Sequence, residues 1–470
     1  MRKRLPILLL CMLLLLAGCK EKVTIGETKY PIDTVELDLS GAPLENVEVL
    51  GQFTQLKALN VCNTGINGET YDKLTAMLPG CQITWTPMFQ GKAYPADTTA
   101  LTVAELTGTE EAELAYFPKL THLDATACRD YAGLLGLMTQ YPQLQVDYVV
   151  ELGGQNLPAD ATEAVFADIS AEDLQIALKL LPQLKGLKLT GELPAVEVLS
   201  ELQEVYSYVT FDWDVEICGM VVSKDIEKLD LSGIAVADVS EVEDKLGYLP
   251  QLKKVTMCDC GVPNEDMDAL NRRHEDVRFI WNVTLGPYIT VRTDLTEFIV
   301  YKYKYKYYLD DEAAYNLRYC TDMICLDLGH NEITNCEFVA FMPNLKYLVI
   351  ADTEISDLTP LTGLTNLKYL EAFLCPIEDY SPLATLTGLE DLNIGYTQGR
   401  DATPLMQMTW LKRLWWSKCK LSMEARVPVR EALPNTEFVT NQESSTGGGW
   451  RTSQNYYDMR DMLGMHYMHG

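Results

Sequence analysis

The chain has 470 residues and is 47% apolar, which is enough for substantial hydrophobic cores, and its length excludes a single compact domain. A formal net charge of −29 keeps the chain soluble and disfavours nucleic acid as a partner. A solvated acidic surface is the simplest interpretation of this charge, and basic partners or screening by divalent ions are the alternative.

Residues 1–18 have the pattern of a secretion signal. Three basic residues at positions 2–4 precede an apolar run over residues 5–16, which is too short for a stop-transfer helix. The run ends in the sequence LAGC at Cys19, which looks like the lipobox of bacterial lipoproteins. That resemblance implies cleavage before Cys19, attachment of a diacylglycerol to its sulfur, and a lipidated tether over residues 19–30. The expected location is outside the cytoplasm, anchored to the bacterial cell membrane; ordinary secretion with a chance cysteine is the alternative.

Four larger modules occupy residues 31–290, at about 31–90, 91–152, 153–217 and 218–290. Each contains a strand, a second strand 22 or 26 residues later, a helical stretch, and a closing strand that runs to an aromatic residue at Trp85, Tyr148, Trp213 or Trp281. We interpret them as degenerate leucine-rich-repeat modules in one long solenoid. The alternative is four small α/β domains with seams near residues 88–96, 153–158, 216–219 and 285–288.

A connector over residues 291–322 follows, in which tyrosine alternates with lysine at positions 301–307. A period of two predicts a strand with one aromatic and one cationic face. Such a strand could hold nucleic acid or an acidic polymer. In so acidic a chain we favour an amphipathic edge strand whose lysines prevent edge pairing.

Five regular repeats of 22 residues occupy residues 323–421. They share the pattern L-x-x-L-x-L-x-x-N/C-x-L, whose first position is filled by Met323, Leu345, Leu367, Leu389 and Leu411. A period and content of this kind are typical of a leucine-rich-repeat solenoid. No single coil can bury its own apolar residues, so neighbouring coils must stack.

The leucines of each L-x-L step share one face of a short strand, since side chains alternate along a strand. We therefore predict an α/β fold, a leucine-rich-repeat solenoid with short parallel strands on its concave face and helices and loops on its convex face. The repeat LKYLVIADTEISDLTPLTGLTN and the two that follow it resemble the internalin-like repeats of bacterial surface proteins. That resemblance implies a scaffold that binds another macromolecule.

Cysteine stands at the small polar position of four repeats, at Cys128, Cys260, Cys375 and Cys419. We expect these thiols to be buried and structural. Cys258 and Cys260 form a C-x-C pair, but no second pair follows at zinc-binding spacing, so we predict no metal site and no cofactor. We predict no catalytic residues, because the common hydrolase and nucleotide-binding motifs are absent. A hydrolase that acts through two carboxylates is the enzymatic alternative.

The residues that alternate with the inward leucines point out of the concave face of the regular repeats. They include an aromatic set edged by charged side chains, and the predicted partner-binding residues are Tyr347, Tyr369, Glu371, Phe373, Asp391, Arg413 and Trp415. We expect the aromatic side chains to be exposed, because aromatic residues and arginine dominate binding hot spots. The alternative is that the C-terminal tail covers them.

A C-terminal cap over residues 422–441 is expected to close the repeats. Residues 442–470 then combine a Gly-rich linker with a tail rich in aromatic residues and methionine. Tyr456, Met459 and Leu463 have helical spacing. Such a tail is too apolar to stay in solvent, so we expect it to dock on the solenoid or on a partner.

These observations together predict a cell-surface lipoprotein whose concave face binds a protein or peptide partner outside the cell. Two alternatives use the same sequence features. One is an envelope glycan-binding protein in which the aromatic residues stack on sugar rings, and the other is a structural envelope component.

Overall fold

The computed structural model describes residues 21–300, 308–439, 447 and 449–465. The predicted signal sequence, the lipidation site at Cys19 and the alternating Tyr/Lys strand at 301–307 lie outside these residues. The chain divides into two compact units, residues 1–214 and 215–470. Within the described residues, no helix is long and apolar enough to cross a membrane.

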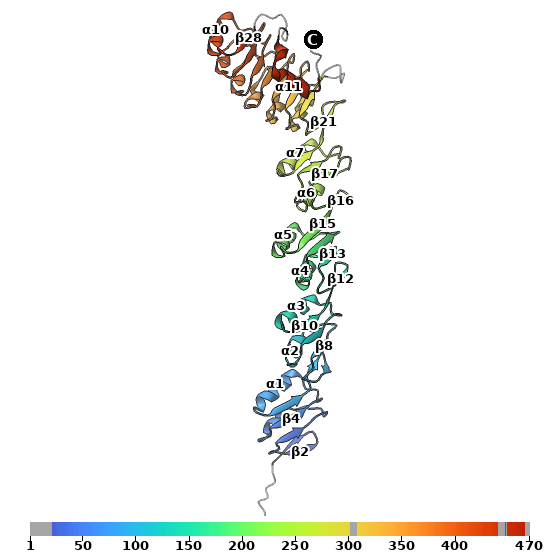
Figure 1. Ribbon diagram of the computed structural model, residues 1–470. Helices are drawn as coiled ribbons and strands as arrows, with labels where there is room; N and C mark the ends of the chain where they lie inside the picture. Colours follow the sequence, from blue (N-terminus) through green and yellow to red (C-terminus); the bar gives the residue numbers. More distant parts are fainter. Residues whose placement is uncertain (1–20, 301–307, 440–446, 448, 466–470) are drawn as a thin grey trace, which may run out of the picture. The chain divides into compact units, whose positions relative to one another are not determined.

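The first unit contains three small sheets of parallel strands, and antiparallel hairpins come before the first sheet and between the sheets in the sequence (Figure 1). The parallel strands are β3 (Glu36–Asp38), β4 (Ala58–Val61) and β5 (Gln82–Trp85), then β8 (Ala100–Thr102), β9 (His122–Asp124) and β10 (Gln145–Asp147), then β13 (Glu163–Ala167), β14 (Gly186–Thr190) and β15 (Thr210–Ile217). The hairpins are β1 (Lys22–Ile25) with β2 (Thr28–Pro31), β6 (Met88–Phe89) with β7 (Lys92–Ala93), and β11 (Val149–Leu152) with β12 (Gln155–Pro158).

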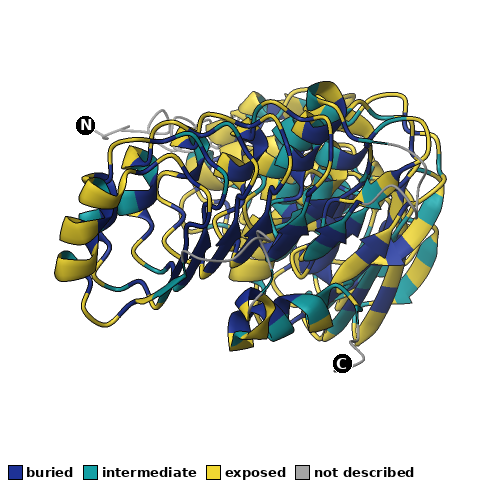
Figure 2. Cartoon of the chain, turned by 90° about the horizontal axis from the view of Figure 1, so that it is seen from above, coloured by how far each residue is buried: buried dark blue, intermediate teal, exposed yellow. Residues whose placement is uncertain are grey.

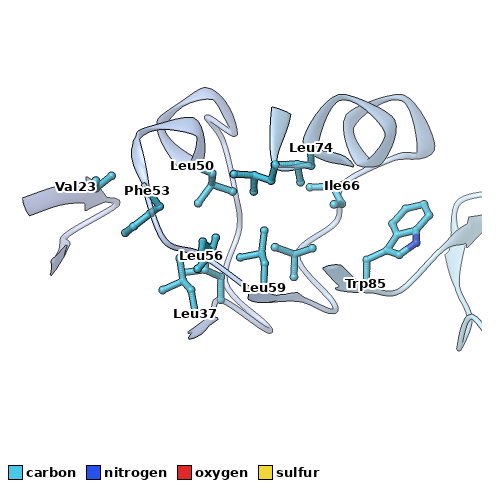
Figure 3. Close-up of a cluster of buried hydrophobic side chains, with 12 residues drawn as sticks. Val23, Leu37, Leu50, Phe53, Leu56, Leu59, Ile66, Leu74 and Trp85 are labelled. Atoms are coloured by element: carbon cyan, nitrogen blue, oxygen red, sulfur yellow. The ribbon is translucent and has the colours of Figure 1, made fainter. Parts of the chain in front are cut away.

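Short helices connect the strands of each sheet in the first unit. They are η1 (Glu48–Gln52), α1 (Gly68–Met77), α2 (Glu110–Leu114), α3 (Tyr131–Gln140), α4 (Ala171–Leu180) and α5 (Val196–Val205). Polar side chains begin several of them: the Ser170 hydroxyl accepts a hydrogen bond from the backbone N–H of Asp173 at the start of α4. Figure 3 shows how such a module is filled, with Leu37 and Leu59 from strands and Leu50 and Leu74 from helices pointing toward one another.

The second unit begins with a module of the same kind. Its elements are β17 (Lys228–Asp230), α6 (Ser240–Leu246), β18 (Lys254–Thr256), α7 (Asn264–Arg273) and β19 (Arg278–Ile280), followed by the hairpin β20 (Asn282–Thr284) and β21 (Thr290–Arg292). The strand before β17 in the sequence, β16 (Met220–Ser223), is the fourth strand of the sheet that contains β13, β14 and β15. The three-strand content predicted for each module is thus observed. The sheets are separate, and hairpins lie at or beside the seams of the four-domain alternative.

The regular repeats form one seven-stranded parallel sheet. Its strands, in spatial and sequence order, are β22 (Glu297–Ile299), β23 (Cys325–Asp327), β24 (Tyr347–Val349), β25 (Tyr369–Glu371), β26 (Asp391–Asn393), β27 (Arg413–Trp415) and β28 (Glu437–Val439). The central leucine of each coil pairs with that of the next, and the leucine side chains are fully buried. The 22-residue step predicted from the sequence is therefore the register of the sheet.

Short helices lie on the other side of these coils. They are α9 (Asp311–Tyr315), η2 (Asn316–Tyr319), η3 (Glu337–Phe341), η4 (Thr359–Leu361), η5 (Ser381–Thr385), η6 (Pro404–Gln407) and α10 (Met423–Ala432). A coil of 22 residues leaves room for little more than one turn of 3-10 helix. Pro360, Pro382 and Pro404 stand in the first turn of η4, η5 and η6, where a missing N–H costs nothing.

In four of the five coils, the small polar position donates to backbone carbonyls at the exit from a strand. The hydroxyls of Thr353 and Thr397 donate to Ile350 and Ile394 at 2.8 and 2.7 Å, and the Cys375 thiol donates to the Ile350 carbonyl at 3.0 Å. Burial raises the pKa of the Cys375 thiol. The four thiols at this position are buried, as predicted, and the described cysteines are all free thiols.

One buried carboxylate holds the second module to its hairpin. Glu110 is 2% exposed and accepts hydrogen bonds from Gln90 Nε2 at 2.6 Å, Thr107 N at 2.8 Å and Gly108 N at 2.9 Å. Burial acts to raise its pKa, but the bonds from Gln90 and Thr107 outweigh burial and lower the pKa to about 2.

We expect Glu110→Gln to destabilise α2 and the β6–β7 hairpin by about 1–3 kcal/mol at pH 7, because an amide group turns a donor toward these N–H groups. A lowered pKa stabilises the fold fully above the ordinary carboxyl range and loses that effect as pH falls toward 2. The difference from wild type should therefore shrink below pH 4, as measured by amide hydrogen exchange. Glu111→Gln, at an exposed position of the same helix, should leave exchange unchanged.

Candidate binding surface on the concave sheet face

Two columns of side chains cover the concave face of the seven-stranded sheet, because every strand contributes its first and third residues to that face. The first column is Glu297, Cys325, Tyr347, Tyr369, Asp391, Arg413 and Glu437. The second column is Ile299, Asp327, Val349, Glu371, Asn393, Trp415 and Val439. The two columns together carry five carboxyl groups and one guanidinium group.

The C-terminal tail lies across this face (Figure 1). It consists of η7 (Trp450–Thr452) and α11 (Gln454–Met462), and the Ser453 hydroxyl caps α11 by accepting from Tyr456 N at 3.2 Å. Its residues contact alternate strands in reverse order: Trp450 lies against Trp415 of β27, Tyr456 against Tyr369 of β25, and the Met459 carbonyl accepts from the Cys325 thiol of β23. We call residues 449–465 the docked segment.

Arg413 anchors the beginning of the docked segment. Its two terminal nitrogens donate to the carbonyls of Trp450 at 3.0 Å and Gly449 at 2.7 Å. The guanidinium also lies over the Trp450 ring, 5.1 Å from the centroid, and 3.6 Å from the carboxylate of Asp391. A planar guanidinium suits this task, because it can donate to two carbonyls and stack on an aromatic ring at once.

A second guanidinium comes from the docked segment itself. Arg451 Nη2 donates to Glu371 Oε1 at 3.0 Å, and the Tyr369 hydroxyl donates to the other oxygen of this carboxylate at 2.7 Å. Glu371 is 1% exposed. Burial acts to lower the pKa of Arg451, but the Glu371 charge outweighs it and raises that pKa. Burial and the same carboxylate raise the pKa of Tyr369 well above its usual value, so both partners keep their protons.

The remaining polar contacts follow the helix. Asn455 Nδ2 donates to Asp391 at 2.9 Å and to Glu390 at 3.1 Å, and the Tyr347 hydroxyl lies 3.4 Å from Asp458. Between these bonds, the rings of Tyr369 and Trp450 pack with centroids 5.3 Å apart. The contact therefore combines aromatic packing with a hydrogen bond or ion pair on most strands.

The expected exposure of the aromatic set is wrong. Tyr369, Trp415, Phe373 and Tyr347 are at most 5% exposed, because the docked segment and neighbouring coils cover them. Figure 2 marks buried residues in dark blue. The alternative reading, that the tail covers this face, is what the structure shows. The role of all seven predicted residues in binding an external partner stays a prediction.

The contact also uses residues that the sequence did not single out as functional. They are Trp450, Arg451, Asn455 and Asp327. The helical spacing of Tyr456 and Met459 indicated a docking helix, and both are nearly fully buried. The sequence Trp-Arg-Thr-Ser before that helix could have indicated both features: the aromatic and arginine residues that anchor the segment, and the serine that caps the helix.

The rim of the concave face has an unusual backbone conformation. The residue that ends each strand turn has a positive φ at the same 22-residue step, in His330, Asp352, Leu374, Tyr396 and Lys418. Asn, Asp and His tolerate this left-handed region, whereas a branched aliphatic residue is strained there. Leu374 has a φ of 65° and is 44% exposed, so burial offsets little of this strain.

The described residues contain no group of three or more His, Cys, Asp or Glu side chains placed to hold a metal ion. Burial raises the pKa of the Cys320 and Cys336 thiols to about 12, which makes both poor nucleophiles near neutral pH. The concave face itself presents carboxylates, a guanidinium and aromatic rings, and these groups contact the docked segment through charge, hydrogen bonds and aromatic packing.

No protein-family description matches the sequence, and no curated protein matches it. Similar solved structures include internalin C2 of Listeria monocytogenes, which is 24% identical over 48% of this chain and 80% of its own, with a TM-score of 0.25. A leucine-rich-repeat protein of Leptospira interrogans is 16% identical, with 87% and 96% coverage and a TM-score of 0.29. Another Listeria monocytogenes internalin is 14% identical, with 93% and 89% coverage and a TM-score of 0.22.

The fold is a leucine-rich-repeat solenoid. The 22-residue register, the parallel ladder and the buried leucines establish this directly.

We expect Arg451→Ala to weaken docking of the segment by roughly 1–3 kcal/mol, because it leaves the Glu371 charge buried without its partner. Glu371→Gln should weaken docking less, since a neutral amide can stay beneath the segment. The double variant should be closer to Glu371→Gln than the sum of the two effects predicts.

Hydrogen-exchange protection of α11 measures these effects. Glu378→Gln, at an exposed position in the same coil, is the matched control. Equal loss of protection in Glu378→Gln and Arg451→Ala would contradict the ion pair as an anchor.

Asp327 gives the contact a pH dependence. It is half-buried near the docked segment. Burial, together with the Glu371 charge, raises its pKa to about 6. The hydrogen bond from Gly329 N and the charges of Arg460 and Arg451 act to lower the pKa, but they do not outweigh burial. A raised pKa means that docking is favoured at low pH and weakens as pH rises through 6. Asp327→Asn should therefore strengthen docking at pH 7.5, by on the order of 1–2 kcal/mol.

The same substitution should have little effect at pH 4, where Asp327 is largely protonated in the docked state. Protection of α11, corrected for the intrinsic exchange rate at each pH, provides the measurement. Asp379→Asn, at an exposed position, is the control. A pH-independent gap between wild type and Asp327→Asn would show that the carboxyl group does not titrate with docking.

Proposed function

We propose that this protein is exported, is lipid-anchored through Cys19, and binds a protein or peptide partner outside the cell through the concave face of residues 323–421. The observation that carries the proposal is that this face already holds a peptide helix, and holds it by specific contacts: Arg413 binds two backbone carbonyls, and Glu371 pairs with an incoming arginine.

The contacts favour a peptide over a sugar. Backbone carbonyls satisfy Arg413, a helix presents Asn455 to Asp391, and the rings of Tyr369 and Trp415 pack against protein side chains. We therefore place the peptide partner ahead of the glycan alternative.

The rim extends this surface beyond the docked segment. An exposed leucine in a strained backbone conformation is a poor choice for stability alone, and such outliers concentrate at functional sites. We infer that Leu374 contacts the partner directly. It lies outside the hydrophobic cluster that the docked segment forms with the sheet.

The test is capture of surface proteins by the full mature chain, compared with the Trp450→Ala/Arg451→Ala variant, whose segment is released while the concave face is unchanged. We expect the released variant to capture the partner at least several-fold better. Adding Leu374→Asn should weaken capture while stabilising the protein by roughly 0.5–1 kcal/mol, because asparagine tolerates the left-handed region.

Two outcomes would contradict the proposal. Equal capture after Glu371→Ala and Arg413→Ala are added to the released variant would exclude the concave face. A partner captured only by the chain with an intact segment would move the binding site to residues 450–470 and leave the sheet as a scaffold.

A further inference from the structure

The docked segment leaves polar groups on the concave face without partners. Trp415 Nε1 and Ser417 Oγ are fully buried, and neither has a hydrogen-bond partner. Trp415 belongs to β27, and Ser417 is the next outward position of the same coil. The indole N–H of Trp450, from the docked segment, is also unpaired.

Buried donors without acceptors weaken an otherwise well-matched contact. Each can reduce affinity by roughly tenfold relative to an occupant that supplies an oxygen acceptor. The charged groups of the face are satisfied, because Arg413, Glu371 and Asp391 all have direct partners. The docked segment therefore fits the charged and aromatic parts of the face better than it fits the edge at Trp415 and Ser417.

The charge of the face specifies what an occupant must carry. Glu371 and Asp391 are at most 2% exposed, so an occupant must bring a cation to the first and a hydrogen-bond donor to the second. Arg413 takes the main-chain carbonyls of two consecutive residues, a glycine in the left-handed region and the first residue of η7. Tyr369 and Trp415 together hold one aromatic ring, that of Trp450.

We propose that the docked segment is a displaceable internal ligand, and that the concave face is a receptor for an external protein segment with an aromatic–arginine step, a polar helix cap, and additional oxygen acceptors for Trp415 and Ser417. This inference rests on the proposed function and names the chemistry of its partner. The partner recognised is a segment of another protein, and it displaces residues 449–465.

The first experiment measures binding of a synthetic peptide of residues 449–465 to the full chain. We expect the Trp450→Ala/Arg451→Ala chain to bind it, and the wild-type chain to bind it at least tenfold more weakly, because its own segment competes. The same peptide carrying Arg451→Ala should lose at least tenfold in affinity. Absence of binding to the released chain would overturn the proposal.

The second experiment selects a random peptide-display library on the released chain. We expect enrichment of an arginine preceded by an aromatic residue and followed by Ser, Thr, Asp or Asn, with selected peptides at least tenfold tighter than the 449–465 peptide. Ser417→Ala should reduce the tighter binding of the selected peptides. It should slightly tighten binding of the 449–465 peptide, which leaves Ser417 unpaired. A consensus without arginine, or equal effects of Ser417→Ala on both peptides, would overturn the proposal.

Sedimentation of the wild-type chain separates an external partner from a second copy. A concentration-dependent dimer that disappears in Arg451→Ala would identify the occupant as another copy's segment and overturn an external partner. These measurements need no natural partner. If no surface protein is captured, the peptide-binding results can therefore still be interpreted. If the peptide experiments fail, the capture experiment alone decides whether the concave face binds a partner.

Discussion

The seven-stranded sheet depends on one constraint, a 22-residue step that brings equivalent positions of all the regular coils into register. Leu348 pairs with Leu326 on one side and Leu370 on the other, and each is fully buried only because its neighbours are present. A slip of one residue would turn these leucines to the opposite face. The threonine at the small polar position, Thr353 or Thr397, then closes its strand by donating to a carbonyl of its own coil.

The same register determines the chemistry of the concave face. Because outward residues stack in columns, Tyr347 lies beside Tyr369, and Asp391 lies beside Arg413. A continuous aromatic surface with carboxylates among its rings is unfavourable in isolation. Exposure of the rings to water is unfavourable, but covering the rings also removes water from the carboxylates. The docked segment resolves both problems, because it supplies an aromatic ring and a guanidinium in consecutive residues, Trp450 and Arg451.

The repeat architecture could be predicted from the sequence because periodicity is a local property. The five coils, the strand positions, the buried thiols and a helical tail around Tyr456 and Met459 all follow from spacing. The burial of Tyr369 and Trp415 could not be predicted in this way, since it depends on a contact between segments about 35 to 80 positions apart. Spacing identified the outward face of the sheet, but it did not distinguish an outward residue that meets solvent from one that meets another segment. The pairing of Glu371 with Arg451 is a consequence of that docking and has no local signature.

Tethering makes the docked segment a strong competitor with modest contacts. A ligand joined to its site by a short tether acts at an effective concentration on the order of millimolar. An external segment present at micromolar levels must therefore bind about a thousandfold more tightly, or about 4 kcal/mol, to replace it. Copying the contacts of Trp450 and Arg451 cannot supply that difference. The surplus must come from groups that the internal ligand leaves unused, and the concave face offers the unpaired Trp415 and Ser417 donors and the strained, exposed Leu374 at its rim.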